Sequence, residues 1–393
     1  MSTNALFEQR ATQTLRDIDA AGTFKKLRYV TGPMGPTVRL EDAGEVVVLC
    51  SNNYLGLANH PEVVEASRRA LDQYGAGTAS VRFICGTFDA HRELERKLAA
   101  FSGTADALSY VSCWNANEAA IATAVGPNDV ILSDELNHAS IIDSCRLSRP
   151  LRRAIFKHRD LDDLRNQLQE TRANNTELVW VITDGVFSME GAVAGLAGLV
   201  AICREFNAML IVDDSHGVGA IGKTGKGTAE YCGVWGEVDV VTGTLGKALG
   251  GAAGGYVAAS RNFVQLLVQR SRTSLFSNAL PVPVACGASA ALDILQRDTT
   301  LVDRLRSNTQ RIREGLTGLG FDVQDSPSPI VPIMIGDEAE AIRKSERLLE
   351  LGVWVVAFGF PVVPRGKARL RVQVSAALDD DHLAHVLEAF GKL

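Results

Sequence analysis

Short apolar runs alternate with longer stretches of helical spacing through the middle of the chain. Each apolar run is followed at once by polar or small residues. Strands that alternate with helices in this way predict βαβ units and a mostly parallel sheet that is covered on both faces. The runs that we interpret as strands are residues 129–132, 178–183, 208–212 and 238–241.

Polar side chains follow these predicted strands directly. Because the carboxyl ends of parallel strands meet at one edge of a sheet, where ligands of such folds bind, we expect these side chains to converge. The sequence therefore predicts an α/β fold with a binding site at that edge. The side chains concerned are His138, Asp184, Ser188, Asp213, His216, Thr244 and Lys247.

The two ends of the chain have other patterns. A predicted helix at 5–21 stops at Gly22, and residues 38–50 are typical of a hairpin. We expect an N-terminal helix and hairpin segment at 1–52, a large α/β domain at 53–284 and a smaller C-terminal α+β domain at 285–393. Further predicted helices are 62–74, 90–102, 284–297, 300–318 and 380–391, and further predicted strands are 328–335, 352–357 and 369–374.

Composition and charge argue against several classes of protein. The chain has 393 residues and a net charge of −6 that arises from interspersed charges, which indicates neither a nucleic-acid nor a membrane surface. Its seven cysteines are odd in number and form no CxxC pair, so we expect reduced thiols and no metal site. The start is polar, and no apolar run reaches the roughly 18 residues of a membrane span. We expect a cytoplasmic protein.

Lys247 and Asp213 are the pair of residues that most strongly suggests a chemistry. Lys247 follows an apolar strand and lies among Gly, Ala and Thr, and Asp213 ends the preceding apolar strand. Pyridoxal phosphate requires a lysine that forms a Schiff base and a carboxylate that pairs with its pyridinium nitrogen. Taken singly, Lys247 could be an exposed loop lysine and Asp213 a helix cap. Together they predict this cofactor, with His216 near the phenolic oxygen and His138 stacked on the ring.

Two nucleotide-binding patterns are not supported. Residues 217–222 match GxGxxG, but residues 223–227 do not open the helix that would hold a pyrophosphate. A P-loop at Lys247 would require Gly at 241 and Ser or Thr at 248, where the chain has Val241 and Ala248.

Several residues could bind the phosphate of the cofactor or the carboxylate of a substrate, and each of them could instead have a purely structural role. Residues 112–117 precede a helical run, whose first turn could bind the phosphate or merely be capped by Ser112; Trp114 could equally be core. Thr244 is a second candidate donor. Arg371 alternates with Arg369 and Gln373 on one face of a predicted strand. That face could be a solvated edge, or Arg371 could clamp a substrate carboxylate.

The chain resembles the α-oxoamine synthases, pyridoxal-phosphate enzymes of fold type I that condense an amino acid with an acyl-CoA. The likeness extends nearly from end to end. Residues 80–87, 136–143 and 361–366 are most similar to members that use glycine and acetyl-CoA. The motifs that carry the family resemblance are Ser51–Leu57, Asn137–Ser140, Thr183–Gly191, Val212–Gly217, Gly243–Lys247 and Leu275–Asn278.

The resemblance implies a role for each matching residue. Lys247, Asp213, His216 and His138 would be catalytic, with Lys247 joined to the cofactor. Asn52 and Arg371 would bind substrate. Backbone groups would hold the phosphate together with Thr244, and two residues would come from a second subunit, so the active unit would be a homodimer. The remaining cofactor contacts would be Cys113, Trp114, Ser188, Ser277 and Asn278, the last two from that second subunit.

Departures from the glycine-specific pattern leave alternatives open. They lie at 112–119, at Gly217, at 272–275 and at 358–360. A related synthase could use another amino acid or a longer acyl-CoA, with or without decarboxylation, in a specialised pathway. An aminotransferase or lyase would need no thioester, and a non-enzymatic scaffold would be expected to lose Lys247 or Asp213.

Overall fold

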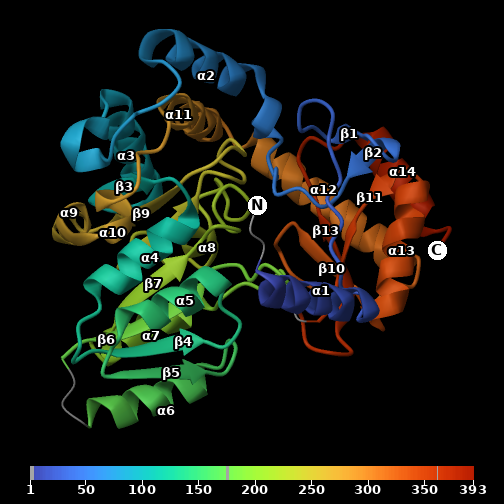
Figure 1. The fold of residues 1–393 in the computed structure, drawn as a ribbon. Coiled ribbons are helices and arrows are strands. Elements are labelled where there is room, and N and C mark those ends of the chain that lie inside the picture. The colour runs from blue at the N-terminus through green and yellow to red at the C-terminus, as the bar shows by residue number, and fades with distance from the viewer. Residues whose placement is uncertain (1–3, 174–176, 361) are drawn as a thin grey trace.

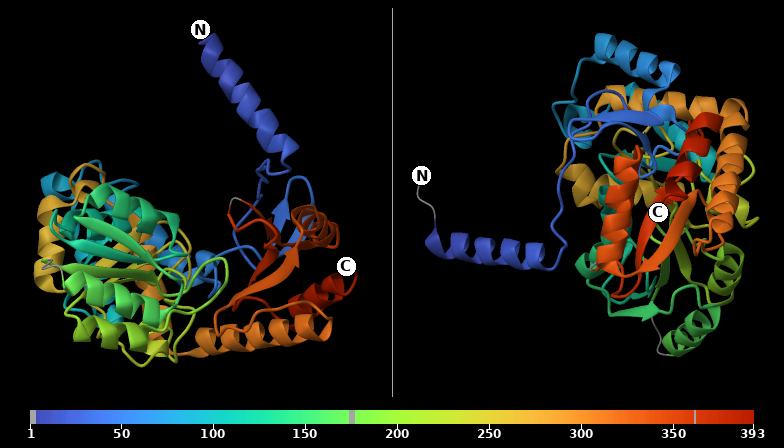
Figure 2. Two further views of the ribbon diagram at one scale, coloured as in Figure 1. Left: turned by 90° about the horizontal axis from the view of Figure 1, so that it is seen from below. Right: turned by 90° about the vertical axis from the view of Figure 1, so that its right-hand side faces the viewer.

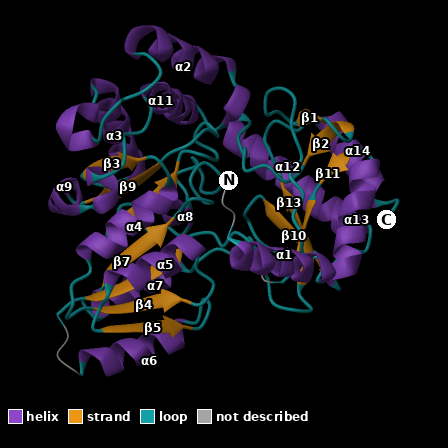
Figure 3. Ribbon diagram, in the orientation of Figure 1, coloured by secondary structure: helices purple, strands orange, loops and turns teal. Residues whose placement is uncertain are grey.

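A seven-stranded sheet forms the centre of the larger lobe (Figures 1 and 3). The computed structural model describes residues 4–173, 177–360 and 362–393. Only β9 runs against its neighbours β3 and β8, so the predicted, mostly parallel sheet is confirmed. In spatial order the strands are β3 (Asp106–Tyr110), β9 (Gly255–Ala259), β8 (Val240–Thr244), β7 (Met209–Asp213), β6 (Val179–Asp184), β4 (Val130–Asp134) and β5 (Arg152–Phe156).

Helices cover both faces of this sheet. Successive residues of β6 enter different apolar clusters: Val181 packs with α6 and α7, whereas Ile182 packs with α4 and α9. Such a strand must be apolar on both faces, which explains why it appears in the sequence as an unbroken apolar run. The helices of this lobe are α4 (Cys113–Ala124), α5 (Ala139–Ser148), α6 (Leu161–Arg172), α7 (Leu196–Glu205), α8 (Thr228–Tyr231), α9 (Arg261–Arg270) and α10 (Arg272–Leu275).

The smaller lobe contains two three-stranded sheets (Figure 2). One has the order β10-β13-β12 and the other β1-β2-β11. The predicted single strand at 352–357 is wrong, because the chain changes sheets at the buried Val355. The strands are β1 (Thr37–Leu40), β2 (Gly44–Val48), β10 (Ile330–Gly336), β11 (Val353–Trp354), β12 (Val356–Phe358) and β13 (Ala368–Gln373), and the helices are α12 (Thr300–Gly318), α13 (Glu338–Glu350) and α14 (Asp380–Phe390).

The N-terminal segment belongs to the smaller lobe through its hairpin. Helix α1 (Ala5–Ala20) is capped by Asn4, ends before Gly22 and extends away from the body, with none of its residues buried (Figure 2). Helix α11 (Val282–Arg297) packs on the larger lobe, against α2 (Pro61–Tyr74) and α3 (Asp89–Ser102). The division at residues 52 and 285 stays a prediction. Short helical turns lie at Leu57–Asn59 and Arg82–Gly86.

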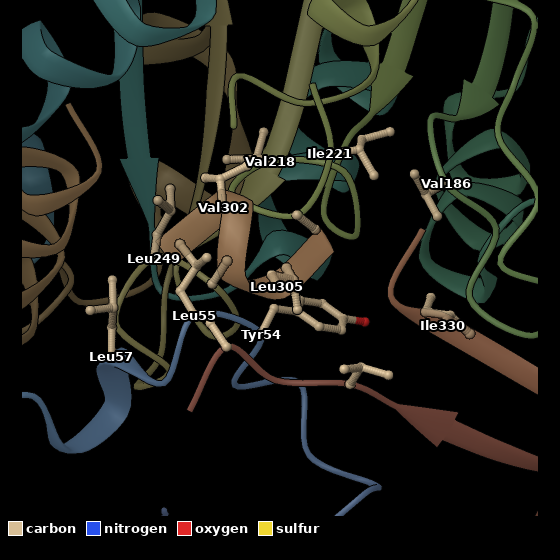
Figure 4. Close-up of a cluster of buried hydrophobic side chains, with 14 of the residues drawn as sticks. Tyr54, Leu55, Leu57, Val186, Val218, Ile221, Leu249, Val302, Leu305 and Ile330 are labelled. Carbon is tan, nitrogen blue, oxygen red and sulfur yellow. The ribbon is translucent and has the colours of Figure 1, made fainter. Parts of the chain in front are cut away.

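An apolar cluster at the junction of the two lobes fixes the loops that follow β7 and β8 (Figure 4). Tyr54, Val218, Leu249 and Leu305 belong to it, and each is at least 95% buried. Burying side chains of this size contributes roughly 1.5–3 kcal/mol each, so the loops are held firmly. Within the described ranges, no helix combines the length and apolar character needed to cross a membrane.

Candidate active site

The carboxyl ends of three neighbouring parallel strands bring the predicted polar residues together. Asp184 ends β6, Asp213 ends β7 and Thr244 ends β8, with Asp184 paired in register with Asp213. Lys247 follows Thr244 by three residues, in the loop after β8. This convergence is the one that the alternating pattern predicts.

Asp213 is a buried carboxylate held by several donors. It is 4% exposed, and its oxygens accept hydrogen bonds from the Asn117 side-chain amide at 2.6 Å and from the Ser215 N–H at 2.9 Å. The Cys113 thiol lies 3.7 Å from Oδ2. A carboxylate fixed in this way can pair with a cationic ring nitrogen, which is the role predicted for Asp213.

Lys247 is an amine whose charged form is disfavoured. Burial lowers the pKa of Lys247 below its ordinary value, and the negative charge of Asp213 opposes that shift. A lowered pKa increases the fraction of the amine that is neutral, and only the neutral amine acts as a nucleophile or base. The loop therefore suits the predicted role of Lys247.

His216 is buried against Tyr54. Its Nδ1 lies 2.8 Å from the Tyr54 hydroxyl, and it is 8% exposed. Burial holds the pKa of His216 well below its usual range, and the positive charges of Lys247 and Arg371 lower it further. The imidazole is therefore neutral at physiological pH.

His138 presents an exposed imidazole at the start of α5. Its backbone N–H donates to the Asp184 carboxylate at 2.7 Å, and its ring Nδ1 lies 2.8 Å from the Ser140 hydroxyl. Partial loss of hydration on the protein side of the ring lowers the pKa of His138, while the charge of Asp213 opposes that shift. The Ser140 hydroxyl also accepts from Asn117 at 2.9 Å, so Asn117 links His138 to Asp213. The exposed ring is suited to stacking on a planar ligand.

The first turn of α4 lies beside the site and contains backbone N–H groups that a helix cannot pair internally. Ser112 caps the helix by accepting from the Asn115 N–H at 3.2 Å, and the following residues are Cys113 and Trp114. The alternative that Trp114 is core is wrong, because its side chain is 44% exposed. Thr244 accepts from Gly246 N–H at 3.1 Å. Phosphate binding by this turn stays a prediction.

Arg371 reaches the site from the smaller lobe. It lies on β13, the central strand of its sheet, so the alternative of a solvated edge is wrong. Its Nη1 donates to the Ser188 carbonyl at 3.0 Å, and its guanidinium lies 4.5 Å from the Phe358 ring centroid. The buried Nε has no hydrogen-bond partner among the described residues. The guanidinium as a whole is only partly buried and held in one orientation, which suits a substrate carboxylate.

Asn52 is joined to Arg371 by Gln373. The Gln373 amide nitrogen donates to Asn52 Oδ1 at 2.5 Å, and its oxygen accepts from Arg371 Nη2 at 3.2 Å. The two predicted substrate residues therefore lie on one hydrogen-bond network. Arg369, by contrast, is 4% exposed and pairs with Glu190 at 3.1 Å, which holds the lobes together.

Ser277 and Asn278 lie elsewhere on the surface. They follow α10, and Asn278 forms a β-bridge with Val81. The structure describes contacts of this segment with residues 80–81 and not with Lys247 or Asp213. Their predicted role in the site of a second subunit stays a prediction.

Three residues of the site were not assigned a role from the sequence: Asn117, Tyr54 and Gln373. Tyr54 falls within the Ser51–Leu57 motif, and Gln373 shares a strand face with Arg371. The sequence pattern could therefore have indicated Tyr54 and Gln373 as site residues. No pattern indicates Asn117, because its hydrogen-bond partners come from separate parts of the chain.

Glycines of the GxGxxG stretch and of the turn that follows it surround the buried side chain of Asp214. A Cβ on Gly217 would lie 2.0 Å from Asp214 Oδ1, and one on Gly227 would lie 2.0 Å from its Oδ2. Thr228 donates to Asp214 from its N–H at 2.8 Å and from its hydroxyl at 2.5 Å. These glycines therefore let the loop close around Asp214.

Residues 44–390 match the aminotransferase class I and II family, so the chain belongs to that family. Among curated relatives, it is 43% identical to the 2-amino-3-ketobutyrate coenzyme A ligase of Escherichia coli K12, over 98% of this chain and 97% of the relative. It is 44% identical to the mitochondrial enzyme of the same name from Homo sapiens, over 96% and 89%. The predicted membership of the α-oxoamine synthases is confirmed.

Solved structures agree with this assignment. Serine palmitoyltransferase of Sphingomonas wittichii superposes with a TM-score of 0.92 at 29% identity, covering 99% of this chain and 98% of that one. A structure of SPT with its PLP internal aldimine also gives a TM-score of 0.92, at 28% identity and the same coverage. The predicted fold type I is therefore confirmed.

Proposed function

We propose that this chain condenses glycine with acetyl-CoA to give 2-amino-3-oxobutanoate and CoA. The observation that carries the proposal is the meeting of Lys247 and Asp213 at the strand ends with Arg371 from the other lobe. The relatives named 2-amino-3-ketobutyrate coenzyme A ligase support the choice of substrates.

The cofactor is pyridoxal phosphate, and the residues present fit it. Lys247 provides the amine, Asp213 a buried carboxylate for the ring nitrogen, and His138 an exposed ring that can stack. The donors of the first turn of α4 can hold the phosphate. When bound, the cofactor supplies an electron sink for a carbanion at the amino acid's α-carbon.

Arg371 and Asn52 orient the amino acid. The guanidinium of Arg371 donates to the substrate carboxylate and is kept in place by Ser188 and Phe358. Orientation by a charged, preorganised donor brings the α-carbon to the base and contributes to rate by restricting motion.

Lys247 acts as the base. Its lowered pKa favours the neutral amine, which removes a proton from the α-carbon of glycine. That carbon then forms a bond with the thioester carbonyl carbon of acetyl-CoA, the C–S bond breaks, and CoA leaves with a proton. Asp213 keeps the ring nitrogen protonated throughout, because its carboxylate is held by Asn117 and Ser215.

The active unit is a homodimer in the cytoplasm. Ser277 and Asn278 contribute to the site of the second subunit, and the exposed Phe276, Phe83 and Ile84 flank them. Apolar side chains gathered on a surface in this way are typical of an interface. Free cysteines support the location.

The test is the release of free thiol from acetyl-CoA by the purified protein loaded with pyridoxal phosphate. We expect release that depends on glycine and is abolished by Lys247→Ala. Serine in place of glycine, and longer acyl-CoA thioesters, test the alternative of a related synthase. Thiol release with one of those and none with glycine and acetyl-CoA would refute the proposed substrates while retaining the family.

A further inference from the structure

A buried chain of hydrogen bonds connects the residue that binds the substrate carboxylate with the histidine beside the cofactor ring. It runs from Arg371 through Gln373 and Tyr54 to His216, over distances of 3.2, 3.0 and 2.8 Å. Gln373 is 1% exposed and Tyr54 is fully buried, so water does not compete along the chain. Each bond must therefore have a defined donor and acceptor.

The direction of the first bond follows from Arg371. A guanidinium can only donate, so the atom of Gln373 that faces Nη2 must be the carbonyl oxygen. The NH₂ group of Gln373 then faces the other way and donates to Asn52 Oδ1 and to the Tyr54 hydroxyl. The orientation of this amide is thus set by chemistry.

The direction of the last bond follows from Tyr54. Its oxygen accepts from Gln373, and its single hydrogen has one remaining partner among the described residues, Nδ1 of His216. Burial raises the pKa of Tyr54 to about 12, so the hydroxyl keeps that hydrogen at physiological pH. Nδ1 of the neutral imidazole is therefore an acceptor, and the ring proton is on Nε2.

We infer that Gln373 is a positioning residue that fixes His216 in its Nε2–H tautomer, so that His216 donates a hydrogen bond to the ring oxygen of the cofactor. The same amide aligns Asn52 and Arg371 for the amino acid. The inference rests on the cofactor assignment of the proposed function and is independent of the identity of the two substrates.

The experiment is ¹⁵N NMR of selectively labelled histidine in the protein loaded with pyridoxal phosphate, without glycine or acetyl-CoA. Comparison with His216→Asn identifies the His216 signals. In the unaltered protein we expect an unprotonated Nδ1 and a protonated Nε2. A protonated Nδ1 would overturn the inference. Because no substrate is present, a failure to condense glycine with acetyl-CoA does not affect this result.

Substitutions of Gln373 test the direction of the chain. Gln373→Glu replaces the donor with an acceptor, so the Tyr54 hydroxyl turns to the carboxylate and accepts from His216; we expect the proton to move to Nδ1. Gln373→Met removes both groups, and we expect loss of the single tautomer in favour of a mixture. An unchanged tautomer in both folded variants would refute the role of Gln373.

A matched control separates this effect from general loss of packing. Asn308 is 4% exposed, and its side-chain amide donates to the carbonyls of Ser375 and Leu378 at 3.0 and 2.9 Å. These two acceptors lie close in sequence to Gln373. Asn308→Leu removes a buried amide without touching the chain, so we expect the His216 signals to stay unchanged. If Gln373→Glu does not fold, Tyr54→Phe interrupts the same chain of hydrogen bonds. We then expect a mixture of His216 tautomers, and a pure Nε2–H form would contradict the inference.

Discussion

The side-chain amide of Asn117 donates a hydrogen bond of 2.6 Å to the carboxylate of Asp213. Its carbonyl accepts from the Thr242 hydroxyl at 2.6 Å, so α4 and β8 together orient the amide. Asn117→Leu leaves Asp213 without this donor. A hydrogen bond to a charged group is worth about 1.5–3 kcal/mol, so we expect kcat to fall about 10- to 100-fold. The measurement is steady-state kinetics, with Asn308→Leu as the control. A wild-type kcat in Asn117→Leu would show that Asp213 does not depend on this amide.

Asp214 makes stability depend on pH. Burial raises its pKa from 3.8 to about 7, so between these values the folded protein binds a proton that the unfolded chain has lost. The contribution of this group to the free energy of unfolding is fully present below pH 3.8. It decreases as the pH rises from 3.8 through 7, by about 4 kcal/mol in total. We expect Asp214→Asn to lack this loss. Urea unfolding between about pH 5 and pH 8 compares the two proteins, and parallel stability curves would contradict the assignment.

Gly227 combines a backbone constraint with a steric one. Its φ is +88°, and an added Cβ would lie 2.0 Å from Asp214 Oδ2. Gly233 also has a positive φ, of +73°, but nothing lies within 4 Å of its Cβ position. We expect Gly233→Ala to cost about 1–2 kcal/mol from strain alone. Gly227→Ala should cost about 1–3 kcal/mol more, because its ψ of −158° is nearly restricted to glycine and because Asp214 must leave Thr228. Equal losses in thermal unfolding would show that the contact with Asp214 is unimportant.

Arg371→Lys tests the carboxylate clamp. Lysine keeps the charge but loses the planar fork that can bind a carboxylate through two hydrogen bonds. We expect KM for glycine to rise about 10- to 100-fold, with a smaller change in kcat. Arg304→Lys is the control, since Arg304 donates to the Leu378 carbonyl at 3.3 Å and lies outside the site. An unchanged KM in Arg371→Lys would place the amino acid elsewhere.

Mixed dimers test whether subunits share sites. Lys247→Ala removes the base, and Ser277→Ala with Asn278→Ala removes the residues proposed to enter the neighbouring site. If sites are shared, a hybrid of the two variants holds one intact site, and random pairing restores about a quarter of wild-type activity. Activity is measured after coexpression and again for each variant alone. No recovery in a verified hybrid would confine each site to one chain.

The parts of the molecule that could be predicted are those that a short stretch of sequence indicates by its own pattern of apolar residues. The strand ends that carry Asp184, Asp213 and Thr244 follow from apolar runs, because strands buried on both faces are apolar throughout. The strands β3, β5 and β9 were not predicted. β5 is an edge strand with two arginines, so it lacks an unbroken apolar run. β9 is buried throughout, but it is rich in Gly and Ala, which have low strand propensity.

Contacts across the two lobes could not be predicted from pattern alone. The hydrogen bond between Tyr54 and His216 joins residues 162 positions apart, and that between Gln373 and Asn52 joins residues 321 apart. No periodicity links such positions. The split of the predicted strand at 352–357 has the same origin, because tertiary pairing assigns Val353 to one sheet and Val356 to another.

The parallel pairing of β2 with β11 has a consequence for biosynthesis. Val47 lies opposite Val353 and Val48 opposite Trp354, so the hairpin meets its third strand only after about 300 further residues have been made. At about 5–20 residues per second, the roughly 300 intervening residues require about 15–60 s of translation. During that interval one edge of the nascent hairpin is unpaired and accessible to other chains and to chaperones. The smaller lobe therefore closes after the larger lobe, although it contains the earliest strand of the described residues.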